Sequence, residues 1–456
     1  MLFKNRKPNV EEELEWLINE LKPSNDILHK PLRLEDKQIE LVYIKSVVDG
    51  AQLQQIVIKP FFELANEQHV EAYLKSLPNQ QDVTSKEQVL LELTKGSVVV
   101  RLKDELLLFD IKKVNTDTVR ETNIEPTIIG PQYALSEDIG TNLNLIRQRY
   151  HKPTLTVETM EVGKKSQQTL AIIYDMEYVG EKVLKQIKSK IESLDQPVIQ
   201  SSTQLQRLLN GRKRSMVPTM MMTERTDRVV YNLASGKVIL LLDGSPTTII
   251  APAVFWDFMT SMEDNYGLYW VTKFSKFLRY LGLFTSLILP GLYVAATSFN
   301  PEVFRVELAL SIAGSRIGVP YPSFVEVLFM LIFMELLTEA SIRLPKAVTG
   351  TATTVGGLIL GTAATEAALA SNIIIIIVGA VAISTFVIPI NEMSFAIRLV
   401  RYLLLLTATV AGLAGLSLGL IGILMYLAKT ESFGEPYFKL FFEKKKAETA
   451  TRVKPS

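Results

Sequence analysis

The amino-acid sequence divides into two unlike halves. Residues 1–257 carry charged side chains throughout and contain no long apolar run, whereas apolar residues dominate from Phe277 to Leu427 and acidic residues become rare there. A hydrocarbon layer about 30 Å thick is crossed by roughly 20 apolar residues in a helix. The second half contains several segments of this kind, so the sequence predicts a soluble half followed by an all-α polytopic membrane domain of four to five spans.

The first predicted span, Phe277–Phe299, indicates how the chain is oriented. Trp270, Lys273 and Lys276 precede this span, and Arg279 lies at its start. Basic residues near span ends are concentrated on the cytoplasmic side, and tryptophan is common at the headgroup boundary. The first residues of the chain also lack the apolar core that a signal peptide requires. We therefore expect the soluble half to lie on the cytoplasmic side.

A second apolar helix, predicted over Phe324–Thr338, contains or borders ionisable residues. They are Glu326, Glu335, Glu339 and Arg343. Because a charge at membrane depth is costly, each should face a protein interior or water. Glu339 and Arg343 are four residues apart and could pair on one helix face. The alternative is that these two lie at the membrane boundary and extend toward water.

The third apolar segment, Ala347–Ser371, is rich in Gly, Ala and Thr rather than Leu and Ile. Helical spacing predicts a mostly hydroxyl-bearing face that could line a water-filled pore, with Glu366 favouring cations. The alternative is a packed helix whose threonines bond their own carbonyls, and the GxxxG pair Gly357 and Gly361 would permit close packing. The candidate pore-lining residues are Thr351, Thr354, Leu358, Thr362, Thr365 and Glu366.

The last two apolar segments leave the topology open. Ile373–Ile390 and Tyr402–Leu427 are both predicted spans, and the second has a glycine stripe suited to packing against a neighbouring helix or subunit. Basic residues lie both before this span and after it, and both clusters favour the cytoplasmic side although one full span separates them. Either the Thr-rich segment is re-entrant, or one basic cluster lies outside. The residues concerned are Gly412, Gly415, Gly419 and Gly422 in the stripe, Arg398 and Arg401 before it, and Lys439, Lys444, Lys445 and Lys446 after it.

Helix and strand patterns alternate in the soluble half, which predicts an α/β or α+β class. A hairpin is predicted where Val238–Leu242 and Thr247–Ala251 flank a turn of sequence Asp-Gly-Ser-Pro. The stretches around Gly96 and Gly236 resemble each other weakly, and we interpret them as two ordinary hairpins rather than two related subdomains. Further strands are predicted at Val89–Leu93, Val98–Leu102, Leu106–Ile111 and Leu170–Tyr174, and helices at Val10–Leu21, from Ser136 onward and at Glu181–Leu194.

Composition and motifs exclude several classes of function. The chain has no cysteine, so disulfides and thiolate metal sites are excluded, and a net charge of +1 argues against a nucleic-acid partner. His29, His69 and His151 are scattered, and each is interpreted as a surface residue. No HExxH, no GxxxxGK[ST] and no paired Ser/His arrangement occurs. We therefore expect no catalysis, no cofactor and no metal site.

An ordered set of short motifs between about residues 120 and 440 resembles the GerA family, the A subunits of nutrient germinant receptors in endospore-forming bacteria. Each motif alone is weak, but their order along the chain is specific. Among them are Ile129-Gly130-Pro131, Ser136-Glu137-Asp138, Leu145-Ile146-Arg147, the stretch from Thr223 to Arg228, Asp243-Gly244-Ser245-Pro246, Leu289-Pro290-Gly291, Ser315-Arg316, Arg343-Leu344-Pro345-Lys346 and Ser432-Phe433-Gly434-Glu435-Pro436.

The resemblance implies a subunit in the inner membrane of a dormant spore, with its soluble region on the core side. Family members are described as homo-oligomeric, pentameric channels for monovalent cations that act with a transporter-like B subunit and a lipoprotein C subunit. The implied domains are two small α/β subdomains, 1–120 and 121–256, a transmembrane domain, 257–430, and a basic tail, 431–456. Departures from the family motifs, such as Ile129 and Gln132 where arginines are common, leave a divergent paralogue open.

The leading hypothesis is a ligand-gated monovalent cation channel that triggers germination, with the soluble half as its assembly and gating ring. The second hypothesis is a secondary transporter with midplane carboxylates Glu335, Glu339 and Glu366. The third is a non-conducting membrane scaffold. Membrane lipid is a partner in all three.

Overall fold

The computed structural model describes residues 10–34, 37–81, 85–103, 105–113, 120–122, 125, 127, 129–210 and 215–438. The chain forms two compact units. The first comprises residues 1–214 and 220–252, and the second comprises residues 215–219 and 253–456. The lysines predicted in the tail, from Lys439 onward, lie outside the described residues.

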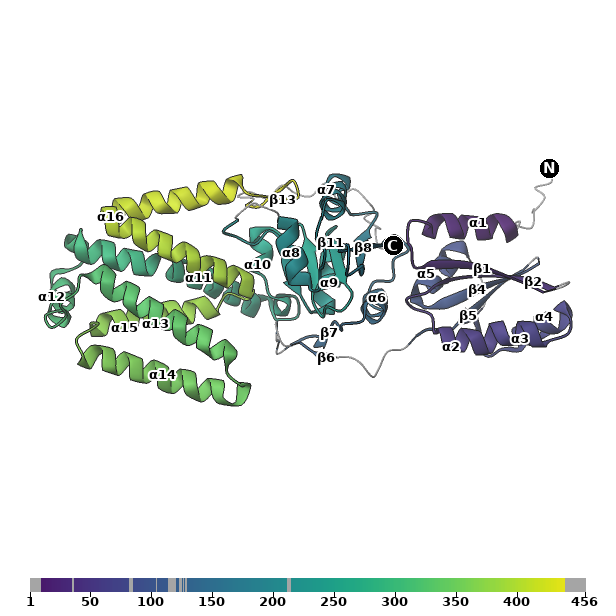
Figure 1. The fold of residues 1–456 in the computed structure, drawn as a ribbon, viewed down its shortest axis with the longest axis horizontal. Helices are drawn as coiled ribbons and strands as arrows, with labels where there is room; N and C mark the ends of the chain where they lie inside the picture. Colours follow the sequence, from purple (N-terminus) through teal and green to yellow (C-terminus); the bar gives the residue numbers. More distant parts are fainter. Residues whose placement is uncertain are drawn as a thin grey trace. The chain divides into compact units, whose positions relative to one another are not determined.

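The first sheet has five antiparallel strands in the order β1-β2-β4-β5-β3. Helices α1 and α5 cover one face, and α2, α3 and α4 cover the other (Figure 1). The strands are β1 Ile27–Leu34, β2 Lys37–Ile44, β3 Gln80–Gln81, β4 Ser97–Leu102 and β5 Glu105–Asp110; the helices are α1 Val10–Leu21, α2 Gly50–Leu53, the π-helical turn η1 Gln54–Ile58, α3 Lys59–Glu63, α4 Glu67–Ser76 and α5 Lys86–Lys95.

Alternate side chains of the central strands build two separate cores. Val98 and Val100 of β4 belong to the core that contains Phe61 of α3. Val99 between them belongs to the opposite core, with Leu17 of α1. Because successive side chains of a strand point to opposite faces, a strand covered on both sides is apolar without interruption.

The second sheet also has five antiparallel strands, in the order β10-β12-β11-β9-β8. Helix α9 packs on β9 and β11, and α8 packs on β12. The strands are β8 Leu155–Val162, β9 Gln168–Asp175, β10 Met221–Thr223, β11 Val238–Leu242 and β12 Thr248–Ala251; the helices are α6 Ile139–Arg147, α7 Glu181–Glu192, α8 Ser202–Asn210 and α9 Thr226–Ala234, and a small ribbon of β6 Arg120–Glu121 and β7 Tyr133–Ala134 precedes them.

The two sheets share one topology. Written from β8, the second order β8-β9-β11-β12-β10 corresponds strand for strand to β1-β2-β4-β5-β3. In each subdomain a helix and then a glycine of positive φ precede the last hairpin, Gly96 after α5 and Gly236 after α9. An added Cβ would lie 2.7 Å from Lys112 Cβ at Gly96 and 2.3 Å from the Tyr178 carbonyl oxygen at Gly236. The resemblance around the two glycines therefore marks equivalent positions in two related subdomains, and not two unrelated hairpins.

The predicted hairpin is confirmed, because β11 and β12 pair antiparallel across Gly244, whose φ is 74°. The predicted strand at Val89–Leu93 is wrong. These residues lie in α5, which is capped by the Ser85 side chain at its start and by Gly96 in the left-handed conformation at its end. A short apolar run does not distinguish strand from helix by itself, and the two capping residues decide it here.

The second unit is helical. Among the described residues, two helices are long and apolar enough to cross a membrane, α11 and α16, and α12 and α15 are shorter apolar helices. The bounds are α10 Phe255–Phe258, the 3₁₀ turn η2 Met262–Asn265, α11 Tyr269–Ser298, the 3₁₀ turn η3 Pro301–Val303, α12 Val306–Ser315, α13 Ser323–Arg343, α14 Lys346–Glu366, α15 Asn372–Phe386, α16 Asn391–Lys429, β13 Glu431–Ser432 and β14 Glu435–Pro436.

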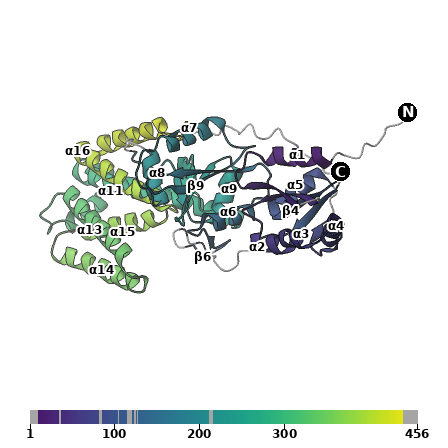
Figure 2. The ribbon, with the colours of Figure 1, turned by 45° about the vertical axis from the view of Figure 1, so that its right-hand side comes forward.

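Helix α16 is a hairpin of two arms (Figures 1 and 2). Its backbone leaves the helical region at Ala411, with φ −135° and ψ 21°, and at Gly412, with φ 59° and ψ −138°. A positive φ of this kind is adopted readily by glycine. The chain then returns so closely that a Cβ added at Gly415 would lie 2.0 Å from the Thr407 carbonyl oxygen. The predicted single span Tyr402–Leu427 is therefore wrong, because it joins parts of both arms, 391–410 and 413–429.

Candidate functional site in the helical unit

Helix α14 carries the predicted hydroxyl-bearing face and leaves it largely uncovered within one chain. Thr354 and Thr362 are exposed, Thr365 is partly buried, and Leu358 is 67% exposed. The side chain of Thr351 lies outside the described part of the chain. An uncovered face on a helix of this length indicates contact with water, lipid or another molecule.

The threonine hydroxyls of α14 donate to carbonyl oxygens of their own helix. Thr354 Oγ1 donates to Gly350 O at 2.8 Å, Thr362 Oγ1 to Leu358 O at 3.0 Å and Thr365 Oγ1 to Thr362 O at 2.8 Å. These bonds to the helix's own carbonyls are the ones that the packed-helix interpretation predicts. That interpretation also requires the threonine face to be buried, and within a single chain it is not. Since each hydroxyl oxygen keeps its acceptor capacity, the face can still accept from water or bind a cation.

The glycines of α14 approach their neighbours to different extents. An added Cβ would lie 3.1 Å from Leu337 Cδ1 of α13 at Gly356, but 3.7 Å from Leu337 Cδ2 at Gly357 and 3.9 Å from Ile375 Cγ2 at Gly361. The last two values are ordinary contact distances. Of these three glycines, Gly356 therefore approaches α13 most closely. Gly357 and Gly361 of the GxxxG pair make only ordinary contacts within one chain.

Glu366 is the last residue of α14 and is exposed. It forms no hydrogen bond and no ion pair with any other described residue. Its carboxylate is therefore positioned at one end of the threonine face rather than in its middle.

Glu326 is buried near the start of α13 and joins two loops. Its carboxylate binds Arg316 at 2.9 Å and accepts the backbone N–H of Ser371 at 3.2 Å. Arg316 also donates to the carbonyl oxygen of Tyr321. Ser371 is the residue before α15, so this one carboxylate ties the loop after α12 to the loop between α14 and α15.

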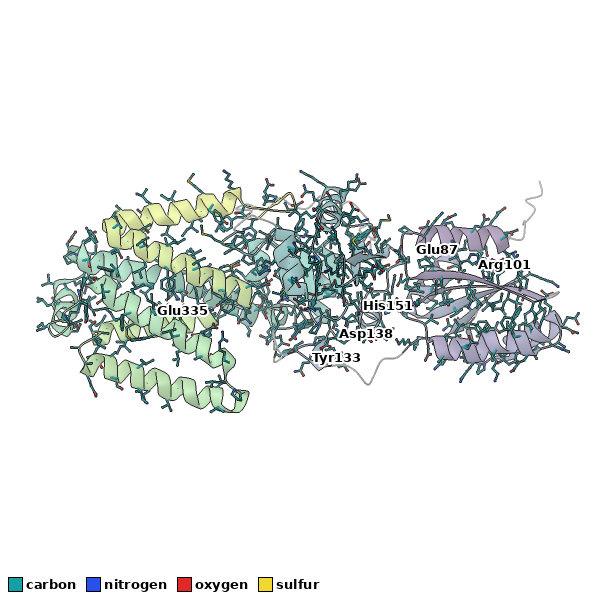
Figure 3. The ribbon with its side chains drawn as sticks, in the orientation of Figure 1. Glu87, Arg101, Tyr133, Asp138, His151 and Glu335 are labelled. Carbon is teal, nitrogen blue, oxygen red and sulfur yellow. The ribbon has the colours of Figure 1, made fainter. Side chains whose placement is uncertain are left out.

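Glu335 of α13 (labelled in Figure 3) binds two arginines of the first arm of α16. One carboxylate oxygen binds Arg401 at 2.7 Å and the other binds Arg398 at 2.5 Å. Arg401 is fully buried and its Nη1 also contacts Thr385 Oγ1 of α15 at 3.5 Å, while Thr385 bonds Ser286 of α11 at 3.1 Å. Four helices therefore meet at one chain of polar contacts.

The predicted pair Glu339 and Arg343 forms, at 2.7 Å, and both side chains remain exposed. The pairing that one interpretation predicts is therefore present, and so is the access to solvent or headgroups that the other predicts. An exposed pair of this kind contributes little stability.

The glycine stripe of α16 packs mainly within its own hairpin. Gly415 and Gly419 face the first arm, since an added Cβ at Gly419 would lie 2.6 Å from Thr407 Oγ1. Gly412 lies at the break, against Phe299 of the α11 end, and Gly422 has nothing within 4 Å.

Sequence reasoning placed Arg398 and Arg401 before the last span, whereas both lie inside α16 and neutralise Glu335. The sequence did contain an indication of this ion pairing, because two arginines in one apolar helix need carboxylate partners in another. Arg316 and Thr385 carried no comparable signal, since their roles depend on which loops and helices meet.

In the first unit, a buried ion pair joins the two five-stranded subdomains. Arg147 at the end of α6 binds both carboxylate oxygens of Asp26, which precedes β1, at 2.8 Å each. Ser46 and Ser24 donate to the same carboxylate. Burial by itself would raise the pKa of Asp26, but the guanidinium and the two hydroxyls hold the pKa below its usual range.

Other motif residues of the first unit fix local structure. Asp138 caps α6 by accepting from the Thr141 N–H, and hydrogen bonds from the side chain and the backbone of Thr141 lower the pKa of Asp138. Asp243 in the β11–β12 turn accepts from the Ile139 N–H at 3.1 Å. The buried Arg225 binds Asp227 and the carbonyl oxygen of Pro131. These residues hold elements of the fold together.

The described residues contain no group of three His, Asp or Glu that could hold a metal ion. His29, His69 and His151 are exposed, as interpreted from the sequence. The chemistry of the helical unit is therefore that of paired charges, hydroxyl oxygens and one uncovered small-residue helix.

A family model described as Bacillus/Clostridium GerA spore germination protein matches residues 15–454. The chain belongs to the GerA family. Its GerA relatives include spore germination protein KA of Bacillus subtilis (strain 168), 31% identical over 441 residues, which are 94% of this chain and 81% of that protein. An uncharacterized membrane protein of the same organism, YfkQ, is 29% identical over 439 residues, 94% of this chain and 85% of that protein. With its two long apolar helices, the chain is a membrane protein of the GerA family.

Among solved structures, the chain is similar to the crystal structure of the N-terminal domain of the A subunit of the Bacillus megaterium spore germinant receptor GerK3. The sequence identity is 21% and the TM-score is 0.42, and the match covers 55% of this chain and 96% of that chain. None of the names of these GerA relatives denotes a catalytic activity.

Proposed function

We propose that this GerA protein is the A-type membrane subunit of a spore nutrient germinant receptor, and that it assembles into a homo-oligomeric channel for monovalent cations. By family resemblance the ring is a pentamer that acts with B and C subunits in the spore inner membrane. The soluble unit lies on the core side and acts as an assembly and gating ring.

The observation that carries the proposal is the uncovered threonine face of α14. Glu326, Glu335 and Glu339 are each bound by arginine within the chain, whereas Glu366 has no such partner among the described residues and Thr354 and Thr362 are exposed. In a ring of copies, these faces would surround the axis. Hydroxyl oxygens would then line the pore, and the carboxylates of Glu366 at one end would attract cations.

The break in α16 supports a topology of six crossing segments, α11, α13, α14, α15 and the two arms of α16. The arms measure roughly 30 Å and roughly 26 Å at 1.5 Å per residue, close to the thickness of the hydrocarbon layer. An even number of crossings returns the chain to the side where it entered. The basic residues at the start of α11 and at the end of α13, and Lys429 at the end of α16, then all lie on the cytoplasmic side, as the charge bias of membrane proteins requires.

A transporter mechanism is less well supported. It needs carboxylates that change partner or protonation state during the cycle. Glu335 is bound by two arginines and Glu339 by one. Of the three carboxylates named for that hypothesis, Glu366 alone has no bond to another described residue, and it lies at a helix end.

The proposal is tested by potassium flux through the purified protein in liposomes. Thr362→Leu should reduce flux at least roughly tenfold, because an apolar ring favours drying of a pore. Glu366→Gln should lower the preference for cations over anions. The matched control is Thr285→Leu, since Thr285 is partly exposed and also bonds its own helix, through Leu281 O on α11.

Equal flux in Thr362→Leu and in wild type would reject the pore face. No flux in any sample, with the oligomer intact by native mass spectrometry, would reject autonomous conduction and favour the scaffold hypothesis or a requirement for the B and C subunits. Adding those subunits distinguishes these two cases.

A further inference from the structure

An apolar groove lies in the helical unit between α11 and the two arms of α16. Its volume is about 460 Å³, within the roughly 300–1,000 Å³ typical of small-molecule pockets. Phe284 and Leu287 of α11, Ile397 of the first arm and Leu424 of the second arm are among its lining residues. We propose that this groove binds one acyl chain of a membrane phospholipid.

The shape of the groove favours a flexible hydrocarbon chain over a helix. Near the turn of the hairpin the arms are in contact, because an added Cβ at Gly419 would lie 3.0 Å from Leu404 Cδ2. One turn further along, at Gly422, nothing lies within 4 Å. The arms therefore diverge from a closed end, and a helix about 10–12 Å across does not fit a slot that narrows to direct contact.

The surroundings of the groove are those of a membrane interior. Its walls include α11, whose length and composition suit a span, and the two apolar arms of α16. Phe284 is 58% exposed and Leu424 is 51% exposed, so the apolar lining continues onto the outer surface. Water is absent from the hydrocarbon layer. An acyl chain is therefore the available molecule that matches this lining.

The open end of the groove has the residues that suit a phospholipid headgroup. Trp256 stacks on Phe438 at 5.7 Å and meets Tyr280 edge-on at 6.0 Å, and these three residues line the groove. Tyrosine and tryptophan favour the headgroup level of a membrane. Lys273 and Lys276 lie on the same face of α11 as Tyr280, two turns and one turn before it.

Both lysines remain able to meet a phosphate. Asp264 is bound by Arg279 at 2.5 Å, and Lys276 is 4.0 Å from that carboxylate with 37% of its side chain exposed. Lys273 lies over the Tyr269 ring at 5.5 Å. A phosphate at this level would place its acyl chain beside Tyr280 and along the groove.

The test uses the full-length protein in vesicles of phosphatidylcholine and phosphatidylglycerol that contain a trace of phosphatidylglycerol with a diazirine on one acyl chain. After illumination, labelled peptides are identified by mass spectrometry. Label should concentrate on the α11 and α16 residues of the groove. Leu424→Trp, which fills the groove, should reduce this label several-fold, while Leu418→Trp on the same arm, at a residue 67% exposed and outside the groove, should not.

Uniform labelling of all apolar faces, unaffected by Leu424→Trp, would overturn the proposal. So would a groove that takes label only after residues 439–456 are removed, because the occupant would then be the chain's own tail. A groove that takes label only after dissociation into monomers would assign it to a second copy and also overturn the proposal. Replacing Lys273 and Lys276 by Gln should lower the preference for phosphatidylglycerol while the groove still takes phosphatidylcholine. The proposal requires the helices to lie in a membrane and does not depend on ion conduction.

Discussion

At the residue scale, the buried ion pairs are the points where single changes should have large effects. Both Arg147 and Arg401 are almost or entirely buried, with exposures of 2% and 0%. A buried charge that loses its partner is strongly destabilising, whereas an exposed pair is worth little. The two units therefore each contain one site where this contrast can be measured against an exposed control.

In the soluble unit, we predict a pH-dependent contribution from Asp26. Its pKa is lowered in the folded state, so its carboxylate adds stability above the pKa of the unfolded chain, and that stability is lost as pH falls through the lowered folded pKa. Thermal unfolding of the full-length protein at a series of acidic pH values should therefore show a steeper loss for wild type than for Asp26→Asn.

At neutral pH, Asp26→Asn should destabilise the soluble unit by about 3–5 kcal/mol, because Arg147 is left without its carboxylate. Asp195→Asn is the control, since Asp195 is 75% exposed in its pair with Lys164. Parallel pH curves for wild type and Asp26→Asn would contradict the assignment of this ion pair as a major contributor.

In the helical unit, we predict that Glu335→Gln destabilises the detergent-solubilised protein by several kcal/mol, about the 3–5 kcal/mol expected for a broken buried pair. Glu339→Gln, one turn along the same helix, should change stability by less than about 1 kcal/mol. The measurement is the thermal unfolding midpoint in one detergent.

The double variant Glu335→Gln with Arg401→Leu separates a buried charge from a general packing defect. If the uncompensated charge causes the loss, removing Arg401 as well should restore part of the stability, because apolar replacement of buried ion pairs is often tolerated. Additive losses in the double variant would argue that packing at this position, and not charge, is responsible.

At the scale of elements, the sequence predicted secondary structure best where local signals agree. The hairpin of β11 and β12 has turn residues, apolar strands and a glycine with positive φ, and it forms as predicted. At Val89–Leu93 the apolar run favoured a strand, but Ser85 and Gly96 cap a helix around it. The capping residues at the two ends of this ten-residue segment were stronger evidence for a helix than the apolar run was for a strand.

The hairpin in α16 could not be predicted from hydropathy, because both arms are apolar and the apolar run continues across the break. Gly412 is the local signal, yet Gly415, Gly419 and Gly422 follow it at helical spacing and conceal it. The decisive fact is tertiary: the returning arm contacts Thr407 through Gly415. Likewise, the sequence identified Glu335 as a costly intramembrane charge, but its partners depended on which helices meet.

The threonine face of α14 can be recognised from the sequence alone, because it depends on spacing along one helix, and its role in a pore stays a prediction. The threonines follow helical periodicity, and periodicity is a local property. What the sequence did not resolve was whether this face is buried within its own chain. That depends on how α13 and α15 pack, and here Leu337 of α13 approaches α14 at Gly356, on another side of the helix from the threonines.

At the scale of the whole molecule, the break in α16 has a consequence for topology. The two basic clusters that conflicted in the sequence, around Arg398 and after Lys429, are compatible once a second arm returns the chain to its starting side. Glu302, in the loop after α11, then lies on the opposite side of the membrane from Asn391 and Glu431. We predict this arrangement for the native chain.

The natural chain contains no cysteine, so single cysteines report on topology without background. In cells expressing the full-length protein, a membrane-impermeant maleimide should label Glu302→Cys from outside, and should label Asn391→Cys and Glu431→Cys after permeabilisation. The pair Asn391→Cys and Glu431→Cys is the critical comparison, because a straight α16 would put these positions on opposite sides. If the intact cell labels one of the two and not the other, the hairpin does not fold back across the membrane, and both the six-segment topology and the groove between the arms must be abandoned.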